Sequence, residues 1–286
     1  MEIEKTIEGI RRKVGQARGQ VVLVPTMGAL HEGHLSLIRK GREIGGPSSM
    51  LVASIFVNPI QFGPTEDLRR YPRPFEEDCR KCEASGVDLI FAPEPGEVYA
   101  ADRSVTITER SLSQTLCGMS RPGHFDGVCT IVTKLFNIIL PDVAVFGKKD
   151  FQQLAIIRRM VRDLNFPVEI QGVDTVREQD GLAMSSRNTF LQHEERVQAA
   201  AIYAGLSAAR MAFAKGESST EALLGIVKDT IAKRAPSARV DYLELVNCDT
   251  LDPVREVHDN GLIAVAAFFG KTRLIDNIEL TRDLRL

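Results

Sequence analysis

The sequence predicts an α/β protein in which a doubly wound parallel sheet is followed by a smaller α+β domain. Short apolar runs such as Val21–Val24 and Val143–Phe146 alternate with helix-like stretches through the first 176 residues, and this alternation is typical of parallel sheets. Beyond residue 177, two Ala-rich helical stretches precede three strand-like runs that have no helices between them. We therefore expect one domain over residues 1–176 and a second over residues 177–286.

Composition and charge restrict the class of protein. The chain has 286 residues, 44% of them hydrophobic and 26% charged, which is ordinary for a globular protein of one large domain or two smaller ones. A net charge of −2 disfavours a general nucleic-acid binder. No apolar run approaches the ~18 residues of a membrane helix, and Met1–Gly19 is too polar for a signal peptide. Five irregularly spaced cysteines favour a reducing compartment, so we expect a cytoplasmic location.

The first domain is expected to alternate strands with helices. Its strands are predicted from compact apolar or alternating runs at Val21–Val24, Met50–Val57, Val87–Phe91, Ser104–Thr108, Val143–Phe146, Val168–Gln171 and Val173–Val176. Its helices are predicted at Ile3–Arg18, after Gly28, and at Phe75–Ser85, Val128–Leu140 and Phe151–Leu164. The long segment VNPIQFGPTEDLRRYPRPF is expected to be a functional loop, because compact domains rarely contain loops of this length.

The second domain begins with a polar loop, EQDGLAMSSRN, directly after Arg177. Its helices are predicted at Glu194–Lys215 and Thr220–Arg234, and its strands at Val240–Val246, Leu262–Phe269 and Ile275–Leu280. Because the strands follow one another without helices, we expect them to form a small sheet covered by the two helices.

The stretch Val21–Ile38 is the strongest candidate for a ligand site. A buried strand ends in a tight turn at Gly28, and a helix pattern then begins. Such a junction in a parallel sheet presents backbone N–H groups and the positive end of a helix, which together favour anions. His31 and His34, spaced i and i+3, share one helix face. Gly33 between them would allow a ligand to approach the backbone closely.

Three other polar segments are candidates, each with a plain structural alternative. Gly147–Asp150, GKKD, follows a strand and could bind a nucleotide, or it could be a solvated charged turn. Asn58 and Gln61 carry amides that suit a substrate with hydroxyl and carboxylate groups, or they could be loop amides on water. Ala183–Asn188, AMSSRN, offers hydroxyls and a guanidinium to a triphosphate, or it could be a linker with a helix cap at Ser186.

Spacing excludes the common phosphate-loop and zinc motifs. Neither the lysine after Gly147 nor the lysine after Gly270 lies in a Walker loop, because Asp142 and Val265 stand where the first glycine is required. HEGH is not the HExxH zinc motif, because Leu35 occupies the position of the second histidine. We therefore expect no metal ion bound by protein ligands alone.

The string PTMGALHEGHLSLI carries a family resemblance. Its HEGH resembles the HxGH signature of nucleotidylyltransferase-like adenylating enzymes, which include class I aminoacyl-tRNA synthetases, and the fuller string resembles the pantoate–β-alanine ligase family. VNPIQF, SRPGHFDGV, GKKDFQQL and AMSSRN match this family in the same order, and AMSSRN is also similar to the KMSKS loop. Lys148 departs from the Glu or Gln that is common at its position. The resemblance implies a Rossmann-like fold of the HxGH nucleotidyltransferase type, with the second domain acting as a lid.

The resemblance also implies roles for individual residues. The catalytic set that it implies is His34, which donates a proton, with His31, Lys149 and Arg187. The substrate-binding residues that it implies are Gln61, for pantoate and β-alanine, and Gln153, for pantoate. The ATP-binding residues that it implies are Met27, Gly28, Ala29, Leu30, His31, Glu32, Gly33, His34, Gly147, Lys148, Lys149, Asp150, Val176 (through its backbone), Met184, Ser185, Ser186 and Arg187.

Three further residues are candidates for contact with the nucleotide or its metal. Arg121, in SRPGHFDGV, is implied to face the phosphates. Glu77 and Asp78 stand where some relatives have a magnesium-related acidic pair, but the helix pattern around them predicts a solvated face.

The activity that the resemblance implies is an ATP-dependent ligation. (R)-Pantoate and β-alanine would be joined to give pantothenate, a step of coenzyme A biosynthesis, with AMP and pyrophosphate released and pantoyl adenylate as the intermediate. ATP would be a co-substrate, with Mg²⁺ bound through its phosphates. The family is usually homodimeric, and no nucleic-acid or membrane partner is expected. Two alternatives are a nucleotidylyltransferase that transfers AMP and stops, and a non-catalytic nucleotide-binding module.

Overall fold

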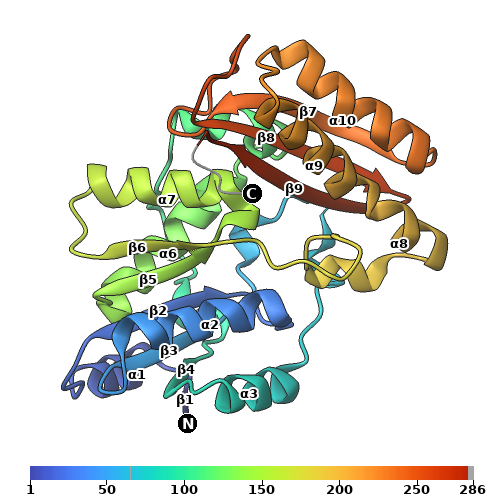
Figure 1. Cartoon of the computed structure of the whole chain (residues 1–286). Helices are drawn as coiled ribbons and strands as arrows, with labels where there is room; N and C mark the ends of the chain where they lie inside the picture. Colours follow the sequence, from blue (N-terminus) through green and yellow to red (C-terminus); the bar gives the residue numbers. More distant parts are fainter. Residues whose placement is uncertain (65, 283–286) are drawn as a thin grey trace. The chain divides into compact units, whose positions relative to one another are not determined.

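The computed structural model describes residues 1–64 and 66–282, which form two compact units (Figure 1). The first unit comprises Met1–Ser111, Arg121–Lys148 and Ile156–Asp174. The second comprises Leu112–Ser120, Lys149–Ala155 and Thr175–Leu286. Two short segments, 112–120 and 149–155, therefore belong to the second unit although the sequence places them within residues 1–176.

The first unit contains a six-stranded sheet in which every pair of neighbouring strands is parallel. Its strands are β1 (Glu2–Glu4), β2 (Val21–Thr26), β3 (Met50–Ile55), β4 (Leu89–Phe91), β5 (Val143–Gly147) and β6 (Glu169–Val173). Their order is β1-β4-β3-β2-β5-β6. After β2, the chain adds β3 and β4 on one side of that strand and then β5 and β6 on the other side. The predicted doubly wound fold is confirmed. Ligands of such sheets bind where the winding reverses, here between the carboxyl ends of β2 and β5.

Buried side chains alternate between the two faces of this sheet. Val22 and Val24 of β2 join a core cluster with Leu37 and Ile38, which lie on α2. Leu23, between the two valines, is 0% exposed, so it must be covered on the opposite face. The helices that cover the sheet include α1 (Ile7–Val14), α2 (Glu32–Gly45), α3 (Phe75–Ala84), α6 (His124–Ile139) and α7 (Phe151–Asp163), of which α7 begins in the second unit.

Three local predictions for the first unit are wrong. The stretch Ile3–Arg18 is not one helix, because Glu2–Glu4 pairs with β4 as an edge strand before α1 begins. Ser104–Thr108 forms no strand despite its alternating pattern. The two strands predicted between residues 168 and 176 are the single strand β6. Each error comes from short segments whose pairing depends on distant residues, which local patterns do not contain.

The second unit contains a three-stranded antiparallel sheet with the order β7-β8-β9. Its elements are β7 (Arg239–Asn247), β8 (Gly261–Phe269), β9 (Thr272–Leu280), α5 (Leu116–Ser120), α8 (His193–Ala199), α9 (Ala201–Ala214) and α10 (Thr220–Arg234). The helix predicted at Glu194–Lys215 is divided into α8 and α9 at Ala200. Ile202, Leu206 and Val227 pack with Val265 and Phe269 in one buried cluster, as the α+β prediction requires.

Within the described residues, no helix is long and apolar enough to cross a membrane.

Candidate active site

The turn between β2 and α2 has a backbone conformation that is rare for residues other than glycine. Gly28 and Ala29 have φ angles of 77° and 50°, both in the left-handed region. The carboxylate of Asp78, on α3, accepts hydrogen bonds from the backbone N–H groups of Ala29 at 2.8 Å and of Leu30 at 2.7 Å. Asp78 is 1% exposed, so the prediction of a solvated helix face is wrong for this residue. Burial raises the pKa of Asp78, and the two backbone hydrogen bonds oppose that effect.

His31 and His34 cap the start of α2, because each ring accepts a hydrogen bond from a backbone N–H of this turn. His31 Nδ1 accepts from the N–H of Gly33 at 3.2 Å, and His34 Nδ1 accepts from the N–H of His31 at 3.3 Å. The two rings lie 4.1 Å apart between centroids. Because Nδ1 is the acceptor in both neutral rings, the ring proton is on Nε2. Both histidines are therefore oriented as Nε2–H donors.

The backbone N–H groups of this turn already have protein partners. The N–H groups of Ala29 and Leu30 donate to Asp78, and those of His31 and Gly33 donate to imidazole nitrogens. The expectation of a ready backbone anion site at this junction is therefore wrong for these four groups. The donors that this turn can offer to an anion are instead the Nε2–H groups of His31 and His34. The side chain of Glu32 pairs with Arg39.

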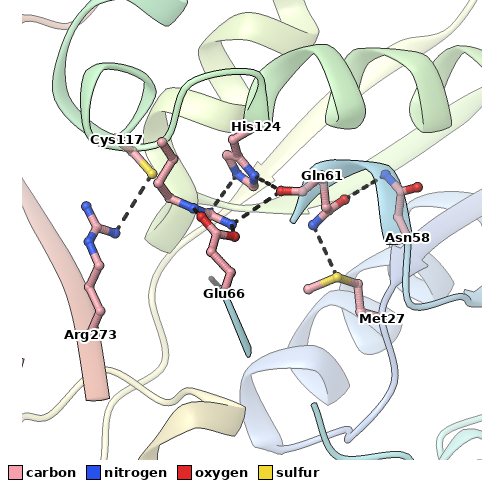
Figure 2. Close-up of polar contacts among 8 residues, drawn as sticks. Met27, Asn58, Gln61, Glu66, Cys117, His124 and Arg273 are labelled. Atoms are coloured by element: carbon pink, nitrogen blue, oxygen red, sulfur yellow. Dashed lines mark hydrogen bonds and ion pairs between the residues drawn. The ribbon is translucent and has the colours of Figure 1, made fainter. Parts of the chain in front are cut away.

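The amide of Gln61, in a short 3-10 turn at Pro59–Gln61, is held in one orientation (Figure 2). Asn58 Nδ2 donates to Gln61 Oε1 at 3.0 Å, so the NH₂ group of Gln61 points the other way. Figure 2 shows that NH₂ group directed at Met27, whose sulfur accepts from Nε2 at 3.2 Å. Gln61 is 8% exposed. Its amide is therefore a donor toward Met27, another residue implied to line the ligand.

Asn58 is in turn fixed by groups outside its own loop. It is 1% exposed, accepts from the Tyr99 hydroxyl at 2.8 Å, and donates to the carbonyl oxygen of Gly127 at 3.0 Å. Burial raises the pKa of Tyr99, which therefore stays a hydroxyl donor. A Cβ atom on Gly127 would lie 2.6 Å from Gln61 Cα, so only glycine allows α6 to approach this closely.

Arg121 bonds to a glutamate within the first unit. Its guanidinium forms a bidentate pair with Glu66 at 2.8 and 2.6 Å, and its Nη1 lies 3.0 Å from His124 Nε2. His124 Nδ1 lies 2.9 Å from the carbonyl oxygen of Gln61. Burial opposes the ionisation of Glu66, but Arg121 outweighs it and lowers the pKa of that carboxyl. This pairing gives Arg121 a role in fastening the Gln61 loop that the sequence does not suggest.

The end of β5 brings Gly147 and Lys148 to the edge of the sheet where β2 also ends. A Cβ atom on Gly147 would lie 3.9 Å from Leu37 of α2, so this residue packs beside the helix that begins at the histidines. Lys148 pairs with the exposed carboxylate of Asp174 at 2.9 Å.

Three expected site residues belong to the second unit: Lys149 and Asp150 lie in the 3-10 turn Lys148–Asp150, and Gln153 lies in the first turn of α7. The carbonyl oxygen of Lys149 accepts from Asn277 Nδ2 at 2.8 Å, and its ammonium lies 3.7 Å from Asp150. This turn is therefore anchored to β9 through its backbone.

The segment 177–188 is a structured, hairpin-like loop. Arg177 and Ala183 form an isolated β-bridge, and the carbonyl oxygen of Val176 accepts from Met184 N at 3.0 Å. Ser185, rather than Ser186, caps the following 3-10 turn by accepting from Arg187 N at 3.2 Å.

Ion pairs hold the first part of this segment, and a hydrogen bond ties its end back to that part. Arg196 of α8 binds Glu178 and Asp180, each at 2.6 Å, and Asn188 Nδ2 donates to Glu178 at 2.8 Å. Arg177 binds the buried carboxylate of Asp276 at 2.6 Å. Ser185, Ser186 and Arg187 thus lie on a segment that is well anchored within the second unit.

The described part of the chain contains no cluster of potential metal ligands. In residues 1–64 and 66–282, no group of three or more His, Cys, Asp or Glu side chains is placed to hold an ion. The two histidines of the HxGH turn use Nδ1 for capping.

Comparisons with known proteins agree with the architecture. The sequence model of the family described as pantoate-beta-alanine ligase matches residues 2–279. A pantothenate synthetase of Akkermansia muciniphila is 52% identical over 263 residues, which cover 91% of this chain and 92% of that protein. The crystal structure of pantothenate synthetase from Thermus thermophilus has a TM-score of 0.93 at 44% identity, covering 98% of this chain and 100% of that one.

A ligand-bound structure is also similar. The pantoate-beta-alanine ligase from Francisella tularensis, complexed with beta-gamma ATP and beta-alanine, has a TM-score of 0.79 at 30% identity and covers 98% of this chain and 97% of that one. The family match and these relatives each extend over nearly the whole chain. The chain therefore belongs to the pantoate–β-alanine ligase family.

Proposed function

We propose that this protein condenses (R)-pantoate with β-alanine at the expense of ATP, giving pantothenate, AMP and pyrophosphate. The observation that carries the proposal is the HxGH turn at the sheet's switch point, with two histidines oriented as Nε2–H donors, in a chain whose family match spans residues 2–279. The ATP and β-alanine bound to the Francisella tularensis relative support the same substrates here.

In the first step, the pantoate carboxylate attacks the α-phosphorus of ATP in line, and the bond to pyrophosphate breaks. Negative charge on the α-phosphate oxygens increases as the new bond forms. The Nε2–H of His34, with that of His31, donates to these oxygens most strongly at that stage, which lowers the barrier rather than merely tightening ATP binding. Lys149 and Arg187 are assigned to the charge of the phosphates and of the leaving pyrophosphate.

In the second step, the amine of β-alanine attacks the carbonyl carbon of pantoyl adenylate. The C–O bond to AMP breaks, and the amine loses a proton as the amide forms. The protein positions the two reactants and excludes water from the mixed anhydride, so no covalent enzyme intermediate is needed.

Magnesium would reach the site on the nucleotide. No described group of side chains has the three or more ligands of a protein-held ion, whereas Mg²⁺ typically keeps several waters and binds substrate phosphates. When bound, it would neutralise phosphate charge. We also propose a cytoplasmic homodimer. The homodimer rests on the family resemblance alone, and the location rests on that resemblance together with the irregular spacing of the five cysteines, which is unlike that of a disulfide framework.

Isotope exchange tests whether adenylation is a separate step. With pantoate, ATP, Mg²⁺ and labelled pyrophosphate, label should enter ATP without β-alanine, because the phosphate-binding residues have no role in activating the amine. Arg187→Ala should lower this exchange about 10- to 100-fold, as expected for the loss of a hydrogen bond between charged groups.

The controls of this experiment separate the alternatives. Exchange that appears only after β-alanine is added would replace the stepwise mechanism by a concerted one. Exchange without any pantothenate when β-alanine is added would indicate an enzyme that stops at AMP transfer. Absence of both, with ATP still bound, would indicate a non-catalytic nucleotide-binding module.

The amides of Gln61 and Gln153 are expected to act on pantoate rather than on ATP. Gln61→Ala and Gln153→Ala should each raise the KM for pantoate by a factor that corresponds to about 1–3 kcal/mol, with a much smaller change in the KM for ATP. Gln16→Ala, on the exposed end of the α1 region, is the matched control. Since the two glutamines lie in different units, their convergence on one substrate is itself a prediction. An effect confined to the KM for ATP would mean that pantoate lies elsewhere.

A further inference from the structure

One face of α3 binds the turn that precedes His31. Asp78 accepts from the N–H groups of Ala29 and Leu30 at 2.8 and 2.7 Å. Three residues later on the same helix, Lys81 Nζ donates to the carbonyl oxygen of Leu30 at 2.7 Å. Residues three apart lie on one face of a helix. The turn is therefore held through both its donors and its acceptor by a helix that begins more than 40 residues later in the chain.

This turn needs such support because of its conformation. Ala29 has a φ of 50°, which a residue with a Cβ atom adopts only where its surroundings enforce it. Gly28, with a φ of 77°, lies so close that a Cβ atom there would be 2.9 Å from Asp78 Oδ2. The carboxylate thus packs directly against the turn, and hydrogen bonds to a charged acceptor are stronger than those to a neutral one.

The conformation of the turn decides where both histidines point. His31 follows Leu30 directly, and His31 and His34 are locked together by mutual capping at the start of α2. A change in the Ala29–Leu30 backbone would therefore rotate the two rings together. A displacement of about 1 Å in a positioned catalytic group can cost about 10²-fold in rate.

We propose that Asp78 is a positioning residue, which orients the His31–His34 pair toward the α-phosphate and does not hold magnesium. The inference rests on the proposed function and deepens it. Each carboxylate oxygen of Asp78 already accepts a backbone N–H, and at 1% exposure the group leaves no room for an ion that keeps several waters. Its neighbour Glu77 is exposed and pairs with Lys81 at 2.6 Å.

The test is pantoate-dependent pyrophosphate exchange in the full-length protein with Asp78→Asn. Asparagine keeps the shape of the side chain and one acceptor but directs an NH₂ group at the second N–H. We expect kcat for exchange to fall about 10- to 100-fold, while the KM for pantoate and the Mg²⁺ concentration for half-maximal rate stay unchanged. Glu76→Gln, which removes one exposed charge from the same helical turn, should stay within about twofold of wild type.

Each other result contradicts one defined claim. Wild-type protein that gives neither exchange nor pantothenate refutes the proposed function, and with it the positioning role that rests on that function. Equal kcat values for wild type and Asp78→Asn would refute the positioning role. Recovery of the variant's kcat at high Mg²⁺ would also refute it, because Asp78 would then be a magnesium ligand. If Asp78→Asn does not fold, Lys81→Met is the second variant, since Lys81 is half-exposed. It should lower kcat about threefold or more, and an unchanged kcat would refute the inference.

Discussion

His34→Asn is expected to lower kcat for pyrophosphate exchange and for pantothenate synthesis about 10²–10³-fold, the loss typical of one donor to a developing anion. Asparagine Oδ1 can replace His34 Nδ1 as the acceptor of the His31 N–H, which lies at 3.3 Å, so the cap of α2 should survive. The Nε2–H donor has no equivalent in asparagine. The variant therefore separates capping from phosphate contact. The thermal midpoint measured by calorimetry should stay within a few degrees of wild type.

His34→Gln provides the complementary change. The NH₂ group of glutamine can lie near the position of Nε2, but its side chain offers no acceptor at the position of Nδ1. The His34→Gln variant should therefore retain more exchange activity than His34→Asn and should lose more thermal stability. His193→Asn, at an exposed position at the start of α8, is the matched control and should leave both quantities unchanged. If asparagine and glutamine variants are equally active, or if either stays within a few-fold of wild type, His34 does not donate to the reacting phosphate.

Arg177→Met should destabilise the second unit by about 3–5 kcal/mol, because it leaves Asp276 as an unpaired buried charge. Asp276 is 4% exposed and bonds to both terminal nitrogens of Arg177, at 2.6 and 3.0 Å. Arg177 also stacks over the ring of Tyr203 at 3.8 Å, a contact that methionine can partly keep. Urea unfolding would measure the loss. Arg162→Met removes an exposed ion pair with Asp163 and should cost at most about 1 kcal/mol.

The pH dependence of Arg177→Met follows from the same carboxyl. Burial raises the pKa of Asp276, and Arg177 opposes that effect, so its removal should raise the pKa further. A carboxyl whose pKa is higher in the folded than in the unfolded state favours folding below the unfolded value, about 3.9, and loses that contribution as the pH rises. The deficit of the variant should therefore be smaller at pH 5 than at pH 7.5. A deficit independent of pH would mean that packing, not charge, explains the loss.

Much of the architecture can be predicted from local patterns. The apolar run Val21–Val24, the break at Gly28 and the helical spacing after it are contiguous, and the structure has β2, a left-handed turn and α2 there. The match is also close for α10, at Thr220–Arg234. These elements are predictable because side-chain periodicity and turn residues act within a few positions along the chain. The three-residue strand β1 is too short to carry such a pattern, and only its pairing with β4 defines it.

In the candidate site, too, the sequence indicates which residues are involved but not how their side chains are oriented. Asn58 and Gln61 stand out in the sequence as amides after a strand, but the orientation of the Gln61 amide depends on Tyr99 and Gly127, which lie 41 and 69 positions from Asn58. The charged neighbours of Asp78 predict a solvated side chain. Its real partners, Ala29 and Leu30, lie 49 and 48 positions away.

By itself, the sequence determined most of the alternation of strands and helices, the HxGH turn at the end of β2 and the family to which the chain belongs. Those features rest on residue types and spacings that are complete within short stretches. Only the tertiary structure decided which way the chemical groups face: that His31 and His34 are oriented as Nε2–H donors and that Asp78 holds their turn. A hydrogen bond needs two groups within about 3 Å and in line. The histidine caps are local contacts, but the turn that carries them is held by Asp78 from 48 and 49 positions away.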